Sequence, residues 1–462
     1  MLAEHRWVAA LALLFAVVYS LISLVGHYHF RTSAYDSGIF SQALYHYSHL
    51  SLGPVSLRDV SVLLADHFEL LLFAFAPLYW LFGTYTLLLI QIAAIIAGGL
   101  GVYALVRYES KDTALAVGAA TAMWLFYGIY SALSFDAHMN VIGIMLLPWL
   151  ILAFVSGRIR AYYVLLALLL LAKENLGLIG VFLGVSLYFT GPKPLRKHAL
   201  ITSAVSALYF MFVIKLLIPA FNHNPYAHWE YTKLGGGPAA AIWHIVTNPI
   251  HTLKLLFDGG DKVFTFKLLA ASGGLLALLA PRYVILLVPV LAQKLLADQP
   301  LFWGYVFHYS AELAPLVALG AAATLAKFKP RWRYGLLGLV ILGNLFVLAY
   351  KIPLTKPLKI FQPVWYRTPY DRAAVMEAIR RIPKDARVSA ENAIAVRLVD
   401  RKTVYLLPAV RDAEYVILNE KDPNYSPFGS QAEVGELRQK FSNDPAWETV
   451  YDNKSVYVFK KR

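Results

Sequence analysis

The chain has 462 residues, of which 58% are hydrophobic and only 15% are charged, and its mean hydropathy is +0.55. Because soluble domains average about 25% charged residues, this composition excludes an ordinary soluble protein and indicates a polytopic membrane protein. The net charge of +14 does not indicate nucleic-acid binding, since Lys and Arg lie mostly in short loops and in the C-terminal part. The absence of cysteine excludes disulfides, thiolate catalysis and Cys-ligated metals.

Apolar stretches near the length that crosses a bilayer, roughly 20 residues, recur between Trp7 and Tyr350. The first follows Arg6 and lacks a signal-peptide cleavage site, so we interpret it as a span rather than a leader. We predict an all-α polytopic membrane protein with about eleven crossings. The predicted spans are 7–26, 84–106, 114–131, 138–156, a broken pair at 161–172 and 175–190, then 198–219, 266–280, 284–298, 309–326 and 334–352.

Four short loops between these stretches are basic, and placing them in the cytoplasm together with Arg6 satisfies the positive-inside rule. We therefore predict an inner-membrane protein with a cytoplasmic N-terminus, whose loops 27–66 and 220–265 face outward. Segment 68–82 is apolar enough to insert, but this topology requires it to be re-entrant or interfacial. The basic loops are 157–160, 191–198, 281–282 and 327–333.

A polar triplet, Lys173-Glu174-Asn175, interrupts the long apolar run between 161 and 190. Charges at membrane depth are costly and usually face a protein interior or a wet cavity. Two interpretations stay open from the residues alone. Two short helices could meet at a polar apex that faces a cavity, or Lys173 and Glu174 could simply neutralise each other inside a helix bundle.

The composition changes near Pro353, which divides the chain into a transmembrane domain, 1–352, and a small extracytoplasmic α/β domain, 353–462. The second part has the amphipathic and alternating patterns of short helices and strands. It carries no glycine fingerprint for a dinucleotide, so a nucleotide-binding function has no support. We predict helices at 371–382 and 432–441, strands at 387–390, 403–407 and 414–419, and a hairpin at 448–459.

The outer loop 220–265 is rich in aromatic and His residues and contains an amphipathic stretch from Ala239 to Phe257. Trp229, Tyr231 and Trp243 in this loop fit either interfacial anchors or groups that stack on a sugar. The triple glycine at 235–237 is not a phosphate loop, because no Gly-Lys-Ser/Thr follows it.

Carboxylates and imidazoles recur on the predicted outer face, and we expect them to form one outward-facing site. Asp36 fits a cap for a helix around 38–49, a role that Ser37 could also take, and it fits a general base or metal ligand. No His-Glu-x-x-His or Gly-x-Ser-x-Gly motif is present, so zinc-protease and serine-hydrolase chemistry is unsupported. The candidate site residues are Asp36, Asp66, His67, Asp136, His138, Lys173, Glu174, His308 and Tyr309.

Five stretches of the chain, in this order, resemble the membrane-protein family catalogued as domain of unknown function 2079. That family is similar to the GT-C glycosyltransferases, which include protein O-mannosyltransferases and aminoarabinose transferases of lipid A. The resemblance covers about Arg31 to Tyr350 and extends into the part after Pro353. The stretches are "YDSGIFSQALYHYSHL", "DHFELLLFAFAPLYWLFGTYTLLLIQ", "SFDAHMNVIGIMLLPWLILAF", "LLLLAKENLGLIGVFLGVSLYF" and "HYSAELAPLVALGAA".

The resemblance implies an enzyme that moves a sugar from a polyprenyl-phosphate carrier to an acceptor hydroxyl on the outer face. It implies that Asp36, the acid of the first outer loop, is the catalytic base, and that His67 lies near the carrier phosphate. GT-C relatives commonly carry paired acids in this loop, whereas Asp36 stands alone here, which leaves a divalent metal as an option and not a requirement. The sequence does not identify the acceptor, which could be a glycan, a lipid or a protein. Two other functions stay open for the chain: a lipid or small-molecule transporter or flippase, and a non-catalytic assembly factor.

Overall fold

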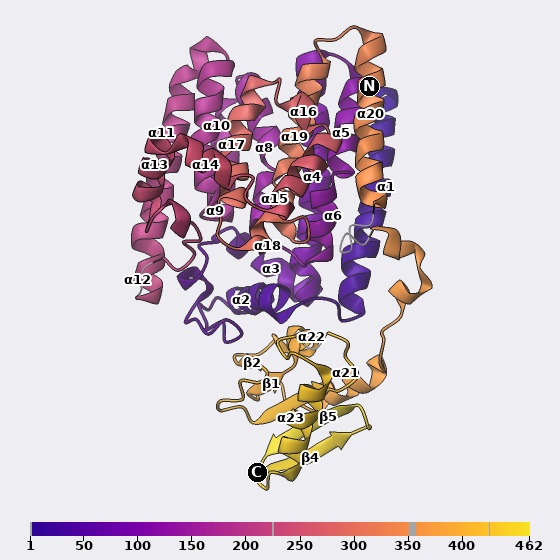
Figure 1. The fold of residues 1–462 in the computed structure, drawn as a ribbon. Helices are drawn as coiled ribbons and strands as arrows, with labels where there is room; N and C mark the ends of the chain where they lie inside the picture. Colours follow the sequence, from indigo (N-terminus) through magenta and orange to yellow (C-terminus); the bar gives the residue numbers. More distant parts are fainter. Residues whose placement is uncertain (1, 224–225, 351–356, 425) are drawn as a thin grey trace. The chain divides into compact units, whose positions relative to one another are not determined.

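The computed structural model describes residues 2–223, 226–350, 357–424 and 426–462 (Figure 1). The chain divides into two compact units. The helical unit comprises Met1–Ser20, His67–Leu71 and Ile90–Leu358, and the mixed unit comprises Leu21–Asp66, Leu72–Leu89 and Lys359–Arg462. The predicted boundary at 352/353 lies outside the described residues.

Four helical runs within the described residues are long and apolar enough to cross a membrane on their own. A bent pair, α5 (Thr113–Trp124) and α6 (Tyr127–Ser134), turns by 40° and makes a fifth if it is one span. The second run joins α3 (Leu72–Phe82) to α4 (Thr86–Ser110), so segment 68–82 leads directly into the predicted span 84–106. The runs are His5–Tyr28, Leu72–Ser110, Lys193–Asn222 and Pro330–Ala349.

The other predicted spans are shorter or interrupted apolar helices. The predicted break at the polar triplet is confirmed, since α9 (Ile159–Ala172) ends before it and α10 (Leu176–Thr190) begins after it. The predicted span 138–156 is one apolar helical stretch, Met139–Val155, with a short turn inside it, whereas the prediction of one span at 266–280 is wrong. The first divides into α7 (Met139–Ile144) and α8 (Leu147–Val155), and the second is interrupted at Gly273, whose φ of 99° takes the chain out of the right-handed helical region.

Small residues set how closely the helices of the helical unit approach. Gly177, Gly180 and Gly184 follow one face of α10, where a Cβ would lie 2.9 Å or less from atoms of α11 (Arg196–Phe212). Glycine at such spacing lets two helix backbones approach where larger side chains would hold them apart. The remaining helices are α1 (Leu2–Tyr28), α2 (Ile39–Ser48), α12 (Ile218–Asn222), α13 (Pro238–Thr247), α14 (Pro249–Leu255), α15 (Gly260–Ala271), α16 (Gly274–Ala277), α17 (Pro281–Leu295), α18 (Pro300–Trp303), α19 (Leu313–Leu325), α20 (Pro330–Ala349), α21 (Arg372–Arg380), α22 (Asn392–Ala395) and α23 (Gln431–Asn443).

The mixed unit contains a five-stranded sheet in the order β2-β1-β3-β5-β4. Strand β1 pairs in parallel with β2 and β3, while β5 runs antiparallel to β3 and β4. All the strands and both helices predicted between 371 and 459 are confirmed. The strands are β1 (Val388–Ala390), β2 (Val404–Leu406), β3 (Tyr415–Asn419), β4 (Trp447–Asp452) and β5 (Val456–Lys461).

Residues 29–66, the loop after α1, belong to the same unit as this sheet. Ser56 donates its hydroxyl to the Val404 carbonyl at 2.7 Å and accepts from the Val404 N–H at 2.9 Å. The buried amide of Asn392 accepts hydrogen bonds from the Ala34 N–H at 2.7 Å and the Ser33 hydroxyl at 3.2 Å. The sheet therefore fixes the turn that carries Asp36 through the side chain of Asn392, which begins α22 directly after β1 and Glu391.

Two buried carboxyl groups follow the carboxyl ends of the parallel strands β1 and β3. Glu391 accepts a hydrogen bond from the Asn419 N–H, and Asp422 accepts one from the Asn424 N–H. Burial raises the pKa of Asp422 to about 6, and burial together with the Asp422 charge raises the pKa of Glu391. Both carboxyls are therefore more easily protonated in the folded state than in the unfolded chain.

This shift predicts that the mixed unit loses stability as the pH rises. A carboxyl group with a raised folded-state pKa stabilises the fold below its unfolded value, here 3.8 for Asp422, and this contribution is lost as the pH rises through about 6. We expect Asp422→Asn to remove about 3 kcal/mol of this dependence, since one pKa unit corresponds to about 1.4 kcal/mol. Hydrogen exchange of β1 and β3 in the full chain, measured between pH 4 and pH 8, tests it, and an unchanged pH profile in the variant would contradict it.

Candidate polar site of the helical unit

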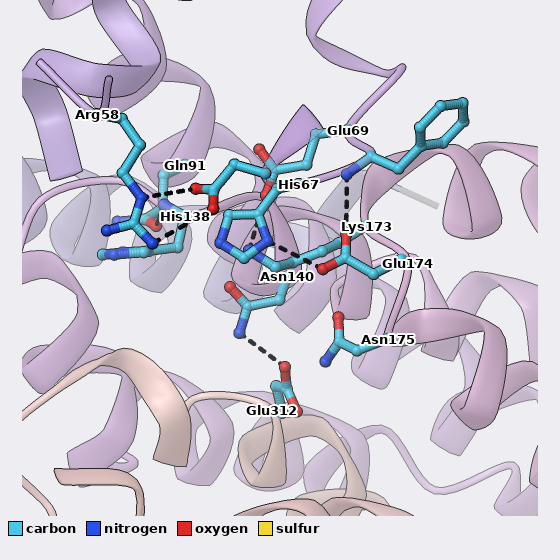
Figure 2. A network of polar contacts seen from close by, with 12 residues as sticks. Arg58, His67, Glu69, Gln91, His138, Asn140, Lys173, Glu174, Asn175 and Glu312 are labelled. Carbon is cyan, nitrogen blue, oxygen red and sulfur yellow. Dashed lines mark hydrogen bonds and ion pairs between the residues drawn. The ribbon is translucent and has the colours of Figure 1, made fainter. Parts of the chain in front are cut away.

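Two buried ion pairs lie at the break between α9, which ends at Ala172, and α10, which begins at Leu176 (Figure 2). Lys173 donates from Nζ to Glu69 Oε1 at 2.8 Å, and the Glu69 side chain is fully buried. His67 Nδ1 lies 3.0 Å from Glu174 Oε1, whose side chain is 2% exposed. A buried charge is costly unless an opposite charge lies beside it. These pairs therefore explain how the charged residues at the break can be buried.

Backbone hydrogen bonds join segment 67–71 to the interruption. The Leu71 N–H donates to the Leu171 carbonyl at 2.8 Å, and the Phe68 N–H donates to Glu174 Oε2 at 3.1 Å. Glu174 thus binds the backbone N–H of Phe68 with one carboxylate oxygen and the His67 ring with the other. This arrangement fixes the position of His67, which keeps 21% of its side chain exposed.

A second cluster of polar side chains lies between α7 and the start of α19. Asn140 on α7 donates to Glu312 Oε1 at 2.7 Å, and the rings of His138 and His308 stack with centroids 3.5 Å apart. Gln91 on α4 accepts from the His138 N–H and donates to the Asp136 carbonyl. These contacts hold the turn 135–138, in which Asp136 adopts a φ of 71°.

Several buried polar atoms of this site have no hydrogen-bond partner among the described residues. Buried polar atoms are almost always satisfied, so such a group indicates a position for a bound ligand or water. Three of the atoms are oxygens that can only accept hydrogen bonds. The atoms are Glu69 Oε2, Asn140 Oδ1, Asn175 Oδ1 and His308 Nδ1.

The helical unit contains seven of the nine predicted site residues, and six of them contact another polar or aromatic residue of the site through their side chains. His67 pairs with Glu174, Lys173 with Glu69, and His308 stacks on both His138 and Tyr309. Asp136 is also buried in this unit, held through its carbonyl. In the loop 220–265, Trp229 donates to the Gly235 carbonyl and packs against Tyr231, whereas Trp243 is 71% exposed.

The other two predicted residues belong to the mixed unit. Asp66 pairs with Arg58, whose Nε lies 3.1 Å from Asp66 Oδ2. Asp36 lies in a π-helical turn, Ala34–Gly38, that precedes α2 (Ile39–Ser48), and such turns are frequent at functional sites. The cap of this turn is Ser33, whose hydroxyl accepts from the Tyr35 N–H, so the alternative in which Asp36 or Ser37 supplies the cap is corrected.

Several residues of the site were not among the predicted ones. Gln91 binds the turn 135–138 and Asn140 binds Glu312, but neither belongs to a motif with a known chemistry. Their common signal in the sequence is a polar residue within a few positions of an apolar helix, which membrane proteins reserve for buried contacts. The missed residues of the helical unit are Gln91, Asn140 and Gln293, whose side-chain oxygen accepts a hydrogen bond from Asn175 at 3.2 Å.

The long apolar helices, the buried charged side chains and the small sheet define a polytopic α-helical membrane protein with a small α/β part. Among solved structures the chain is similar to ArnT from Cupriavidus metallidurans bound to undecaprenyl phosphate, with a TM-score of 0.55 and 12% identity over 99% of this chain and 98% of that chain. It is also similar to the apo state of that protein, with a TM-score of 0.54 and 12% identity over 98% and 97%. At this identity the similarity concerns the fold alone.

No curated protein sequence matches the chain. Residues 26–458 match the family described as predicted membrane protein (DUF2079), and the chain belongs to this family. The predictions of family and fold class are therefore confirmed, while the roles of individual site residues stay predictions.

Proposed function

We propose that this protein is a membrane glycosyltransferase that takes a sugar from a polyprenyl-phosphate carrier and transfers it to an acceptor hydroxyl outside the cytoplasm. The observation that carries the proposal is the buried polar site at the helix interruption, where cationic groups and unsatisfied hydrogen-bond acceptors occur together. The likeness in fold to a protein bound to undecaprenyl phosphate supports the carrier class.

Two chemical roles follow for the residues of the helical unit. His67 and Lys173 would bind the carrier phosphate and stabilise its charge when the glycosidic bond breaks. The unsatisfied oxygens of Glu69, Asn140 and Asn175 would accept hydrogen bonds from the sugar hydroxyls. A hydroxyl-rich headgroup would then satisfy the acceptors that protein groups leave open.

The proton of the acceptor hydroxyl needs a base. We assign this role to Asp36, in keeping with the resemblance to GT-C enzymes, and Asn392 would keep its turn in position. The acceptor oxygen attacks the anomeric carbon, the bond from that carbon to the phosphate oxygen breaks, and Asp36 takes the hydroxyl proton. One displacement inverts the anomeric configuration, and a divalent metal stays an option that chelation of the purified protein would test.

The first experiment compares donors on the purified full chain in lipid nanodiscs. We expect release of polyprenyl phosphate from a polyprenyl-phosphate sugar in the presence of a membrane lipid extract, and no reaction with a nucleotide sugar. A panel of pentose and hexose donors covers the sugars that the geometry does not distinguish. Mass spectrometry of the lipid products measures the release.

The alternative function is transport, because interrupted helices with charges at the break also form the substrate sites of transporters. Proteoliposomes that move the intact donor across the bilayer without releasing polyprenyl phosphate would support transport and overturn the proposed transfer. Binding of no donor in either assay would overturn both.

A further inference from the structure

Two arginines and a histidine lie at the end of helix α1 within the mixed unit. The Arg372 guanidinium lies 3.9 Å from the centre of the Tyr28 ring, and the Arg31 guanidinium lies 4.3 Å from the centre of the Trp365 ring. Both arginines act on His29. Burial lowers the pKa of His29, and the positive charges of Arg31 and Arg372 lower it further. We call these three residues, His29, Arg31 and Arg372, the α1 basic patch.

The two guanidinium groups of the patch have no carboxylate partner among the described residues. Among the described residues, no ion pair includes a member of the α1 basic patch. Arg31 donates to backbone carbonyls of residues 364, 365 and 367, and the Nε of Arg372 is buried without a hydrogen-bond acceptor. Like charges gathered without a counter-charge repel one another, so binding of an anion would stabilise this arrangement.

Exposed apolar side chains adjoin the patch. Phe361 is 78% exposed, Val364 is 65% exposed and Tyr366 is 42% exposed. The Trp365 indole donates to the Leu21 carbonyl at 2.9 Å, which attaches this segment to α1. We call Phe361, Val364 and Tyr366 the apolar rim.

The position of the patch along the chain indicates what covers it. Helix α1 contains the membrane-length run His5–Tyr28, and the patch follows the last residue of that run. Aromatic and basic residues concentrate at this depth in membrane proteins, where rings lie among the headgroups and cations meet the phosphates. An apolar rim beside uncompensated cations matches a phospholipid, whose acyl chains and phosphate lie at neighbouring depths.

We propose that the α1 basic patch and the apolar rim form a binding site for the phosphate headgroup of an anionic membrane phospholipid. Arg372 and Arg31 bind the phosphate, and Phe361 and Val364 contact the upper part of the acyl chains. The site holds the segment after residue 358 at the membrane surface, and it is independent of the transferase function proposed above.

The experiment measures lipid binding to the delipidated full chain by native mass spectrometry. We expect phosphatidylglycerol to bind at least about fivefold more tightly than phosphatidylcholine with the same acyl chains, since each basic group near a membrane surface contributes about that factor. Arg372→Gln should lose about fivefold in phosphatidylglycerol binding, and Arg372→Lys should retain most of it. Phe361→Ser should weaken binding of both lipids alike.

Arg380→Gln is the matched control, because Arg380 lies on the same helix and is paired with Glu377 at 3.0 Å. Equal binding of the two lipids by the wild type, or equal losses in Arg372→Gln and Arg380→Gln, would overturn the proposal. Displacement of phosphatidylglycerol by an equal concentration of glycerol phosphate would indicate a site for soluble phosphates and would also overturn it. If Arg372→Gln does not fold, salt added to the wild type decides, because it must weaken phosphatidylglycerol binding more than phosphatidylcholine binding.

Discussion

Replacement of Asp36 by Asn is expected to reduce sugar transfer by about 10²-fold to 10⁴-fold while the protein keeps its thermal stability. The change removes the negative charge that would accept the proton of the attacking hydroxyl. It replaces one carboxylate oxygen by an amide nitrogen and leaves the shape of the side chain unchanged. Release of polyprenyl phosphate from the lipid-linked donor, in parallel with thermal unfolding, measures both quantities.

The surroundings of Asp36 make this prediction specific. Ser33 caps the turn Ala34–Gly38, and Asn392 binds its first amide, so the shape of the turn is maintained by other residues. Ser33→Ala should therefore lower stability by about 1 kcal/mol, the usual effect of losing such a cap. Asp36→Asn should instead lower turnover, which separates a structural carboxylate from a catalytic one.

Asp59 provides the matched control in the same unit. Its carboxylate is mostly exposed and forms a bidentate pair with Arg411 at 2.6 and 2.8 Å, and exposed pairs of this kind contribute little to stability. Asp59→Asn should leave both turnover and stability unchanged. Equal turnover of Asp36→Asn and the wild type would show that the base is another group and would remove Asp36 from the proposed mechanism.

The sequence predicts some elements of this protein well and others poorly, and the difference is physical. Strands β1, β2 and β3 follow short apolar runs bounded by turn residues, so local pattern is enough to place them. The interruption at Lys173 is equally clear, because charges within an apolar run of that length have few alternatives. Prediction failed at Gly273, since nothing in its apolar neighbours distinguishes a glycine that continues a helix from one that ends it.

The site shows the same limit. Lys173 and Glu174 are adjacent in the sequence, which leaves open whether they neutralise each other or face a cavity. The structure pairs Lys173 with Glu69 and Glu174 with His67. Segment 67–71 lies about a hundred positions from the interruption, and only the folded chain brings the two together. The same holds for Asn392, which reaches the turn of Asp36 from the distant sheet. Pairings of this kind depend on tertiary packing, which a single sequence does not encode as a local pattern.

Replacement of Lys173 by Met is expected to destabilise the protein by about 3 to 5 kcal/mol, the usual cost of removing one partner of a buried ion pair. The variant leaves the carboxylate of Glu69 fully buried without its cation. Thermal unfolding of the purified chain in detergent, monitored by tryptophan fluorescence, measures the loss. Lys233→Met is the control, because Lys233 is 45% exposed in its pair with Asp258 and its loss should have little effect.

The double variant Lys173→Met, Glu69→Gln separates the structural role of Lys173 from a role in donor binding. Removing both charges abolishes the uncompensated carboxylate, so stability should return to within about 1.5 kcal/mol of the wild type. If Lys173 also binds the carrier phosphate, the restored protein should still bind the lipid-linked donor at least about tenfold more weakly, because a charge-assisted hydrogen bond to phosphate is lost. Recovery of donor binding together with stability would assign Lys173 to the fold alone. A stable Lys173→Met single variant would show that Glu69 is held without the cation, and the ion pair would then contribute nothing to the interruption of the helix.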